Sequence, residues 1–222
     1  AAGTLNMWYE SDLDALMTRT CLRPIPTGQV TKNQALFFGV LLSVGSVTLL
    51  YFSSNLMSAS LLLLTICFYF FIYTVWLKRR TPQNIVIGGA AGALPPVIGW
   101  TIATGSLSLE PLILFLIIFL WTPSHFWALS IYKSNDYKKA KIPMLPIIYG
   151  VEKTKKNIFI YSLLMLPTIS APYYMSFLSK IYFYPTLALT IYYIYLCGTL
   201  LKVKKSKEVN TLARKIFLYS IF

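Results

Sequence analysis

Long apolar runs constrain the fold of this chain more than any other feature of its sequence. A helix rises about 1.5 Å per residue, so about 20 apolar residues are needed to cross the roughly 30 Å hydrocarbon core of a bilayer. Runs of that length lie at about 34–53, 58–77, 85–103, 110–131, 158–176 and 182–201, and a seventh begins near 213. Hydrophobic residues make up 56% of the chain and charged residues only 12%. This composition and the absence of strand-period alternation exclude an ordinary soluble domain and predict an all-α, polytopic transmembrane helical bundle.

The basic residues test this prediction, because Lys and Arg accumulate in the cytoplasmic connections of membrane proteins. Of the 20 basic residues, all but Lys180 fall in the segments 1–33, 78–84, 132–157 and 202–215. Six complete spans in strict alternation explain this distribution, with these four segments on the cytoplasmic face. The formal net charge of +13 then reflects membrane orientation, and we expect no nucleic-acid partner. We expect a single domain over residues 1–222 that is a fragment of a longer chain at both ends.

The first candidate site is the acidic stretch "NMWYESDLD" near the start of the chain. Asn6, Glu10 and Asp14 are spaced four apart and share one face of a helix, whereas Asp12 points away. Two carboxylates and an amide carbonyl form a hard oxygen site suited to Mg²⁺, which binds proteins through one or two carboxylates plus substrate phosphates. The alternative is a polar helix end that only marks the membrane interface.

A second candidate is the stretch "YKSNDYKKAKIPMLP" at 132–146, which follows an apolar run directly. Asp136 would supply the partner carboxylate to the first acidic face, with phosphate contacts from Lys138, Lys139 or Lys141. The alternative is a surface ion pair worth under about 1 kcal/mol.

A third candidate is "YTVWLKRRTPQN", in which Tyr73 lies near the end of a span and Asn84 opens the next one. Lys78 and Arg79 could clamp a diphosphate, because guanidinium groups bind phosphate oxygens in pairs. The general orientation bias of membrane proteins produces such basic clusters as well, so this alternative stays open.

The only histidine, His125 in "LWTPSHFWALSI", lies inside an apolar run. Ionisable groups within a membrane are costly and are therefore candidates for function. Haem axial ligation, proton transfer and a polar contact to substrate are the functional options. A neutral histidine that bonds a neighbouring helix is the structural one.

These strings together resemble the UbiA superfamily of intramembrane prenyltransferases, and within it the haem branch, the protohaem IX farnesyltransferases or haem O synthases. "NMWYESDLDALMTRTCLRPIP" is similar to the first Asp-rich motif of that branch. "YTVWLKRRTPQNIVIGGAAGALPPVIGW" and "WTPSHFWALSIYKSNDYKKAKIPMLP" are similar to its central and second-motif regions. The Gly-rich string also predicts close helix packing and a kink at Pro95–Pro96. The resemblance covers essentially the whole chain.

The resemblance implies a bundle of nine helices in the full protein, of which this chain holds six complete spans and partial helices. It implies transfer of the farnesyl group of farnesyl diphosphate to a vinyl group of haem B, with addition of water, to give haem O and diphosphate. Mg²⁺ is the implied cofactor. The implied partners are both substrates, the lipid bilayer, and haem A synthase or a terminal oxidase assembly. The implied location is the bacterial inner membrane, or alternatively the mitochondrial inner membrane, with the acidic motifs on the cytoplasmic face.

The resemblance also assigns roles to single residues. Asn6, Glu10 and Asp14 fall on its first metal-diphosphate motif, and Asp136 falls on the second. The expected diphosphate-binding residues are Arg19, Arg23, Lys78, Arg79, Asn84 and Lys141, and the expected haem or prenyl contacts are His125, Tyr73 and Trp127. The family normally has Asp where this chain has Glu10, so the reach of that carboxylate differs, and Asn135 or a backbone oxygen would complete the second metal shell.

Two other functions stay open at this point. One is a UbiA-type prenyltransferase that acts on an aromatic or quinone precursor, against which the strings around His125 and Pro96 argue. The other is a membrane transporter that uses its acids as a cation path. A transporter predicts acids near the bilayer midplane, yet six of the seven acids, all but Glu110, fall on the basic side.

Overall fold

A computed structural model describes residues 1–221 of the chain. The described residues form helices and loops and no strand, which confirms the all-α prediction. The chain divides into two compact units, the first made of Ala1–Leu107 with Asn135–Pro143 and the second of Ser108–Ser134 with Met144–Phe222. The single domain over 1–222 stays a prediction.

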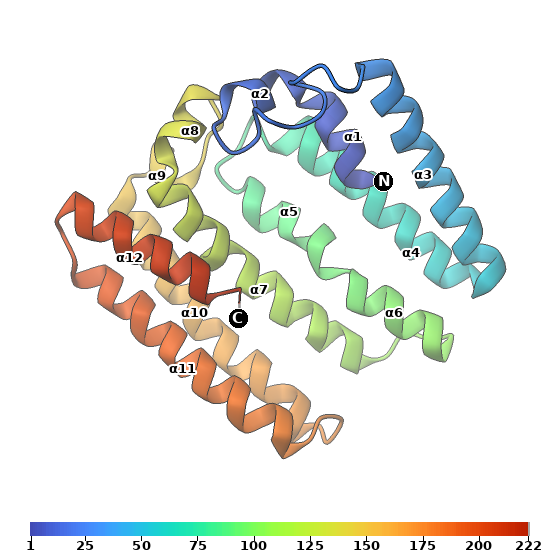
Figure 1. The fold of residues 1–222 in the computed structure, drawn as a ribbon. Helices are drawn as coiled ribbons and strands as arrows, with labels where there is room; N and C mark the ends of the chain where they lie inside the picture. Colours follow the sequence, from blue (N-terminus) through green and yellow to red (C-terminus); the bar gives the residue numbers. More distant parts are fainter. Residues whose placement is uncertain (222) are drawn as a thin grey trace. The chain divides into compact units, whose positions relative to one another are not determined.

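The first unit is built on a hairpin of two long helices (Figure 1). Thr31 begins the first of these helices with a capping box, because its side chain accepts from the backbone N–H of Gln34 and the Gln34 side chain accepts from the backbone N–H of Thr31. Asn55 caps the second by accepting from the backbone N–H of Ser58. The helices of this unit are α1 (Ala2–Tyr9), α2 (Ser11–Leu16), α3 (Lys32–Ser53), α4 (Leu56–Cys67), the π-helix η1 (Phe68–Leu77), α5 (Asn84–Ala93), α6 (Pro95–Thr104) and α8 (Ser134–Lys139), whose first residue belongs to the second unit. α1 packs against α3 and η1, and η1 packs against α5.

The Gly-rich string breaks where its prolines predict. Helix α5 ends at Ala93 and α6 begins at Pro95, because a proline has no N–H to donate to the preceding turn. Gly88 on α5 lets η1 approach closely: a Cβ at this position would lie 2.2 Å from Cδ2 of Tyr73. The lack of a side chain at Gly88 therefore leaves the space that the Tyr73 ring occupies.

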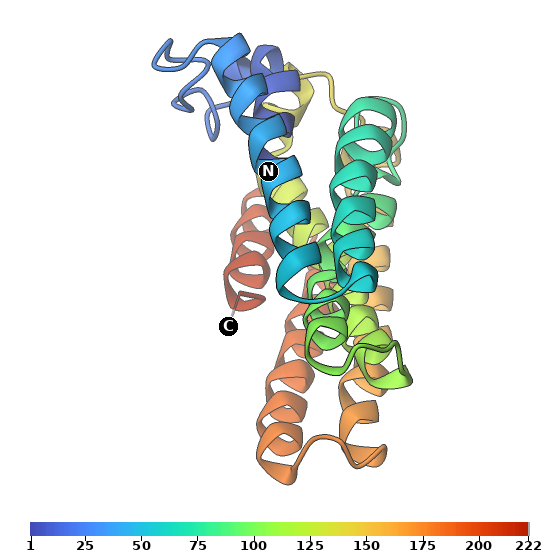
Figure 2. The same cartoon turned by 90° about the vertical axis from the view of Figure 1, so that its right-hand side faces the viewer.

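The second unit consists of α7 (Leu109–Tyr132), α9 (Leu145–Ile148), α10 (Val151–Tyr174), α11 (Lys180–Lys202) and α12 (Ser206–Tyr219). α10 packs against both α7 and α11, and α12 packs against α7 and α11. Figure 2 shows α10 and α11 side by side, joined by a loop at one end. At their other end the buried Lys155 donates to Glu152 Oε1 at 2.6 Å and to the Val203 carbonyl at 2.7 Å. This lysine fastens the start of α10 to the end of α11.

Five helical stretches are long and apolar enough to cross a membrane, namely Lys32–Ser53, Leu56–Leu77, Asn84–Thr104, Leu109–Tyr132 and Lys180–Lys202. They correspond to five of the six predicted spans. The sixth run, 158–176, lies in α10, a 24-residue helix with charged residues in its first turns and prolines at 167 and 172, and its crossing stays a prediction. The run near 213 lies in α12, where Val209, Ala213 and Ile216 form one buried face.

The surface of the long helices suits lipid better than water. Only 11% of the apolar window in α3 is buried, and Phe37, Phe52 and Leu49 are 70–80% exposed. Contiguous apolar surface of this kind marks a membrane-facing region. The protein is therefore an integral membrane protein.

Candidate functional site

The predicted acidic face lies on two short helices rather than on one. The backbone leaves α-helical geometry at Glu10, with φ −102° and ψ 17°, between α1 and α2. The hydrogen bonds nevertheless keep four-residue spacing, from Glu10 N to Asn6 O at 2.9 Å and from Asp14 N to Glu10 O at 2.8 Å. Asn6, Glu10 and Asp14 are all buried, while Asp12 is exposed. The structure therefore separates Asp12 from the other three, as the spacing predicted.

Glu10 is the most deeply buried of these three residues, with 1% of the residue exposed. Its Oε2 accepts from Asn6 Nδ2 at 2.7 Å and forms an ion pair with Lys78 Nζ. Its Oε1 is buried and has no hydrogen-bond partner among the described residues. An unpartnered buried carboxylate oxygen costs free energy, so Glu10 keeps bonding capacity that its own chain does not use.

Asp14 is paired with Arg23 from the loop between α2 and α3. Arg23 Nη1 lies 3.0 Å from Asp14 Oδ1 and 2.8 Å from Oδ2. Thr20 Oγ1 donates to the Asp14 carbonyl at 3.0 Å, and the Arg23 N–H donates to the Thr20 carbonyl at 3.0 Å. These turns fold the loop back over α2 and bring Arg23 to the carboxylate. We call Asn6, Glu10, Asp14, Arg23 and Lys78 the acidic cluster.

Asp136 on α8 belongs to the same unit and is 7% exposed. It accepts from Thr18 Oγ1 at 2.5 Å, so α8 contacts the segment that follows α2. Lys138, Lys139 and Lys141 are exposed. Arg19 is also exposed and forms no ion pair with any described residue.

Arg79 does not join the acidic cluster. Its guanidinium binds the exposed Asp12 through Nη2 to Oδ1 at 3.0 Å and Nη1 to Oδ2 at 3.2 Å, and lies 5.5 Å from the Tyr9 ring centroid. Partial burial raises the pKa of Asp12, but hydrogen bonds from Arg79 and the backbone lower it further and set the net direction downward. The structure thus gives Arg79 a partner outside the predicted diphosphate clamp.

Tyr73 and Asn84 lie close to Lys78. Lys78 Nζ lies 5.8 Å from the Tyr73 ring centroid. Asn84 Nδ2 donates to the Thr81 carbonyl at 2.6 Å, and its Oδ1 is buried without a hydrogen-bond partner among the described residues. Asn84 Oδ1, Glu10 Oε1 and Ser11 Oγ are thus buried oxygens of this unit whose bonding capacity the described residues leave unused.

The donor types in this unit fit Mg²⁺ with a diphosphate, although no three His, Cys, Asp or Glu residues of the described chain lie close enough to form a complete metal site. Mg²⁺ takes oxygen ligands and is commonly bound by one or two carboxylates plus phosphates. Glu10 offers its unpartnered Oε1, and Asp14 offers a carboxylate held by a single arginine. Lys78 and Arg23 supply the positive charge that a diphosphate needs.

The second unit contains a neutral polar cluster around the histidine. His125 Nδ1 lies 2.6 Å from Ser220 Oγ, and the ring lies between Trp121 at 4.4 Å and Phe217 at 4.6 Å between centroids. Trp121 Nε1 donates to the Ser220 carbonyl at 2.9 Å. We call Trp121, His125, Phe217 and Ser220 the histidine cluster, and it joins α7 to α12.

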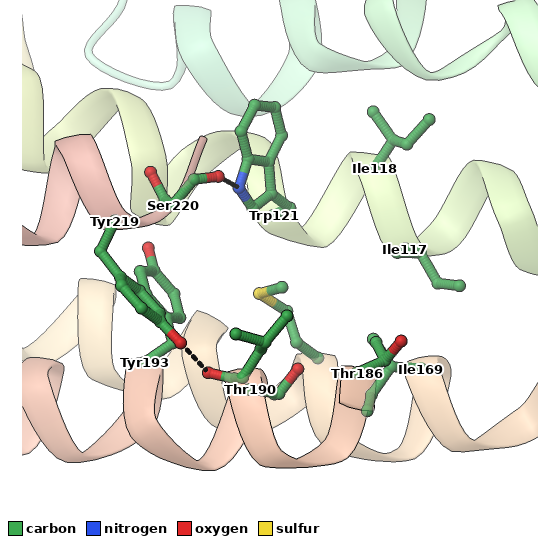
Figure 3. A pocket seen from close by; sticks show the side chains of 11 residues that line it. Ile117, Ile118, Trp121, Ile169, Thr186, Thr190, Tyr193, Tyr219 and Ser220 are labelled. Atoms are coloured by element: carbon green, nitrogen blue, oxygen red, sulfur yellow. Dashed lines mark hydrogen bonds between the residues drawn. The ribbon is translucent and has the colours of Figure 1, made fainter. Parts of the chain in front are cut away.

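A cavity of about 260 Å³ lies beside this cluster (Figure 3). Its wall is mostly aliphatic and aromatic and includes Trp121, Tyr193 and Tyr219. Tyr193 OH donates to Ser124 Oγ at 3.0 Å. Trp127 does not line the cavity: it is 1% exposed and packs edge-on against Tyr161 at 5.2 Å.

Three residues that shape the first unit lie outside the predicted site residues. Thr74 is fully buried and accepts from Asn6 Nδ2 at 3.1 Å. Its position four residues before Lys78, on one helical face, is the signal that could have identified it. Thr18 and Gly88 carry no such signal, because their roles depend on contacts with distant residues.

Comparison with known proteins supports the fold and the family. The model of the UbiA prenyltransferase family matches residues 1–221. A protein named "Protoheme IX farnesyltransferase" from Pelagibacter ubique is 67% identical over 221 residues, covering all of this chain and 73% of that protein. One of the same name from Parvibaculum lavamentivorans is 49% identical and is covered to 70% of its length.

Two solved structures share the fold. A structure described as concerning digeranylgeranylglyceryl phosphate synthase in membranes has a TM-score of 0.76 at 19% identity, over 98% of this chain and 76% of that one. A UbiA homologue from Archaeoglobus fulgidus bound to DMAPP and Mg²⁺ has a TM-score of 0.71 at 16% identity, over 99% and 81%. With the match to the family model over nearly the whole sequence, these findings show that the chain belongs to the UbiA prenyltransferase family.

Proposed function

We propose that this protein transfers the farnesyl group of farnesyl diphosphate to a vinyl group of protohaem IX and so makes haem O. The 67% identity with a protein named for that reaction, over the whole chain, supports the choice of both substrates. In the reaction the allylic C–O bond breaks with its electron pair leaving on the diphosphate. The vinyl group forms the new C–C bond, and water adds to the resulting cation with loss of a proton.

The acidic cluster is the observation that carries this proposal. Glu10, Asp14 and Asp136, with Asn6, would hold Mg²⁺ against the diphosphate, and the unpartnered Glu10 Oε1 supports this assignment. Bound Mg²⁺ would supply Lewis-acid stabilisation of the leaving diphosphate. Lys78 and Arg23 would supply fixed positive charge where negative charge develops on that group.

The carboxylates are neutralised in the free protein by the same two cations. Lys78 contacts Glu10 and Arg23 contacts Asp14, so the cluster has little unbalanced charge before substrate arrives. With Mg²⁺ held by the carboxylates, Lys78 and Arg23 would be available to phosphate oxygens. By this exchange of partners, the acidic cluster would be stable without substrate and would still bind a highly charged one.

Tyr73 would be the aromatic group that stabilises the allylic cation, because its ring lies 5.8 Å from Lys78 Nζ beside the acidic cluster. A good cation–π contact is worth about 0.5 to 2 kcal/mol. The substrate contacts predicted for His125 and Trp127 stay predictions, as do the diphosphate contacts of Arg19, Arg79, Asn84 and Lys141.

The membrane location follows from the chemistry of the substrates. A farnesyl tail and a porphyrin are both apolar, so a bundle in lipid gathers them while the diphosphate stays at a polar mouth. We propose the bacterial inner membrane, with the acidic cluster at the cytoplasmic face, because the basic segments 1–33, 78–84 and 132–157 adjoin it in sequence. Haem A synthase or a terminal oxidase assembly would then receive the product.

Mass spectrometry of haems tests the proposal. Membranes that contain the protein are incubated with haem B, farnesyl diphosphate and Mg²⁺, with and without a chelator. We expect a haem whose mass has grown by one farnesyl group and one hydroxyl group, formed only when Mg²⁺ is free. A parallel incubation replaces haem B with aromatic and quinone-precursor acceptors. Prenylation of those acceptors and not of haem B would reject the proposed acceptor while keeping the family chemistry.

A further inference from the structure

The π-helix η1 contains a buried threonine with an unusual hydrogen bond. We propose that Thr74 is a positioning residue that fixes the Asn6 amide with its oxygen free to bind Mg²⁺. This inference rests on the metal-diphosphate function proposed above. Thr74 itself contacts neither substrate nor metal in this assignment and acts only through Asn6.

The π-helix determines what the Thr74 hydroxyl can do. Lys78 N donates to the Tyr73 carbonyl, five residues back, at 2.9 Å, and Thr74 Oγ1 likewise donates to the Tyr69 carbonyl, five residues back, at 2.9 Å. The hydroxyl of Thr65 in the α-helical turn before it bonds four residues back, to Leu61. A threonine hydroxyl has a single proton, so the proton of Thr74 is committed to Tyr69.

Toward Asn6, the Thr74 oxygen can therefore only accept. Asn6 Nδ2 lies 3.1 Å from Thr74 Oγ1 and 2.7 Å from Glu10 Oε2, and an ionised carboxylate also only accepts. Both hydrogens of the Asn6 amide are thus used. A flipped amide would place its oxygen against two acceptors, so only one orientation is stable.

The consequence is a fixed oxygen. Asn6 Oδ1 forms no hydrogen bond with a described residue, and the bonds to Thr74 and Glu10 prevent it from exchanging places with Nδ2. Thr74 is 0% exposed and Asn6 6%, so water does not compete well for these bonds. Residues that orient a metal ligand in this way typically change metal affinity by about 10- to 100-fold.

The test compares variants of Thr74 by thermal unfolding of the full-length protein while Mg²⁺ is titrated at constant inorganic diphosphate. Thr74→Val keeps the shape and removes the hydroxyl, and we expect about tenfold more Mg²⁺ for the half-maximal rise in Tm. Thr74→Ser keeps the hydroxyl and should restore the wild-type requirement. Thr74→Ala gives the same comparison should the valine variant not fold.

Thr101 offers a matched control in the same unit. It is also 0% exposed, accepts from Ser58 Oγ at 2.9 Å and donates to the Ile98 carbonyl at 2.9 Å. Thr101→Val should lower Tm at every Mg²⁺ concentration and leave the Mg²⁺ requirement unchanged. If Thr101→Val raised the Mg²⁺ requirement as much as Thr74→Val does, the effect would reflect a general loss of stability. The proposal would then be overturned.

A double variant tests whether Thr74 acts through Asn6. In an Asn6→Ala background, Thr74→Val should not raise the Mg²⁺ requirement further, because the amide that it orients is gone. Additive effects, or a wild-type requirement in Thr74→Val alone, would overturn the positioning role. Should Mg²⁺ with diphosphate fail to stabilise even the wild-type protein, the proposed metal site itself would be rejected, which is a separate outcome.

Discussion

The two units each bury a polar cluster, and the clusters differ in charge and in completeness. The acidic cluster of the first unit contains two ion pairs and leaves Glu10 Oε1 without a partner. The histidine cluster of the second is neutral: His125 Nδ1 and Trp121 Nε1 both bond Ser220. A satisfied network of this kind stabilises a fold, whereas an incomplete charged one has capacity for a ligand. Burial of polar groups alone would not have distinguished the two.

The largest expected effect is in the acidic cluster. Asp14→Asn keeps the shape of the side chain and removes a charge that we assign to metal binding, so haem O formation should fall by on the order of 10² or more. Asp12→Asn, two residues away on the exposed side, is the matched control and should stay near wild type. Product haem is measured by mass spectrometry. Near wild-type turnover of Asp14→Asn would mean that the acidic cluster has no catalytic role, and its contrast with the histidine cluster would fail.

Loss of Lys78 should be the largest effect on stability. Lys78→Met leaves the Glu10 carboxylate, 1% exposed, without its cation, and we expect a loss of about 3 kcal/mol in the free energy of unfolding. Arg80→Met is the control, because Arg80 is exposed and in no ion pair with a described residue. Unfolding is followed with and without Mg²⁺, which should recover part of the loss. Equal losses in the two variants would contradict a buried counter-ion role.

Gly88 tests how tightly η1 packs against α5 at the Tyr73 ring. A Cβ at Gly88 would meet the Tyr73 ring at 2.2 Å, so Gly88→Ala must displace the ring and should cost about 1 to 3 kcal/mol. Gly92 on the same helix has nothing within 4 Å of its Cβ position, and Gly92→Ala should be neutral or slightly stabilising. Thermal unfolding of the pair measures the difference. Two variants with the same Tm would mean that η1 and α5 can move apart freely.

Loss of the Ser220 hydroxyl from the histidine cluster should change stability alone. Ser220→Ala removes the partner of His125 Nδ1, and we expect a loss of about 1 kcal/mol with no change in Mg²⁺ requirement. The haem absorption spectrum of His125→Ala is the second measurement, and we expect its Soret band to match that of wild type. A shifted or lost band would instead make His125 an axial ligand, and the neutral cluster would then be functional too.

Sequence reasoning located the acidic cluster because helical spacing is a local property. Asn6, Glu10 and Asp14 recur every four residues, and this spacing survives the break between α1 and α2. The ion-pair partners could not be predicted from the sequence. Lys78 and Arg79 are neighbours in sequence, yet they pair with Glu10 and Asp12 respectively. Adjacent residues on a helix point in different directions, and only the packing of η1 against α1 decides which cation enters the cluster.

The π-helix could not be predicted either. An α-helix and a π-helix over 68–77 differ by one residue in hydrogen-bond register, and the apolar composition of this stretch suits both. That single residue of register decides that Thr74 bonds Tyr69. The kink at Pro95, in contrast, was predictable, since proline removes a donor wherever it occurs.

We expect the smallest effect on stability from the exposed ion pair Asp12–Arg79. The pKa of Asp12 is lowered in the folded protein, so its ionised form contributes stability above the unfolded value of about 3.9. That contribution is lost as the pH falls through the folded pKa. Because the Asp12 side chain is 56% exposed, it should amount to no more than about 0.5 kcal/mol.

The measurement is the Tm difference between wild type and Asp12→Asn, from pH 7 down to pH 3. We expect a small difference in favour of wild type at pH 7 that shrinks as the pH falls below the unfolded pKa, and that high salt also reduces. A difference that grows as the pH falls would give the shift the opposite sign. Should it instead match the loss in Lys78→Met, charge pairing outside the acidic cluster would matter as much as pairing within it, and the contrast between buried and exposed pairs would fail.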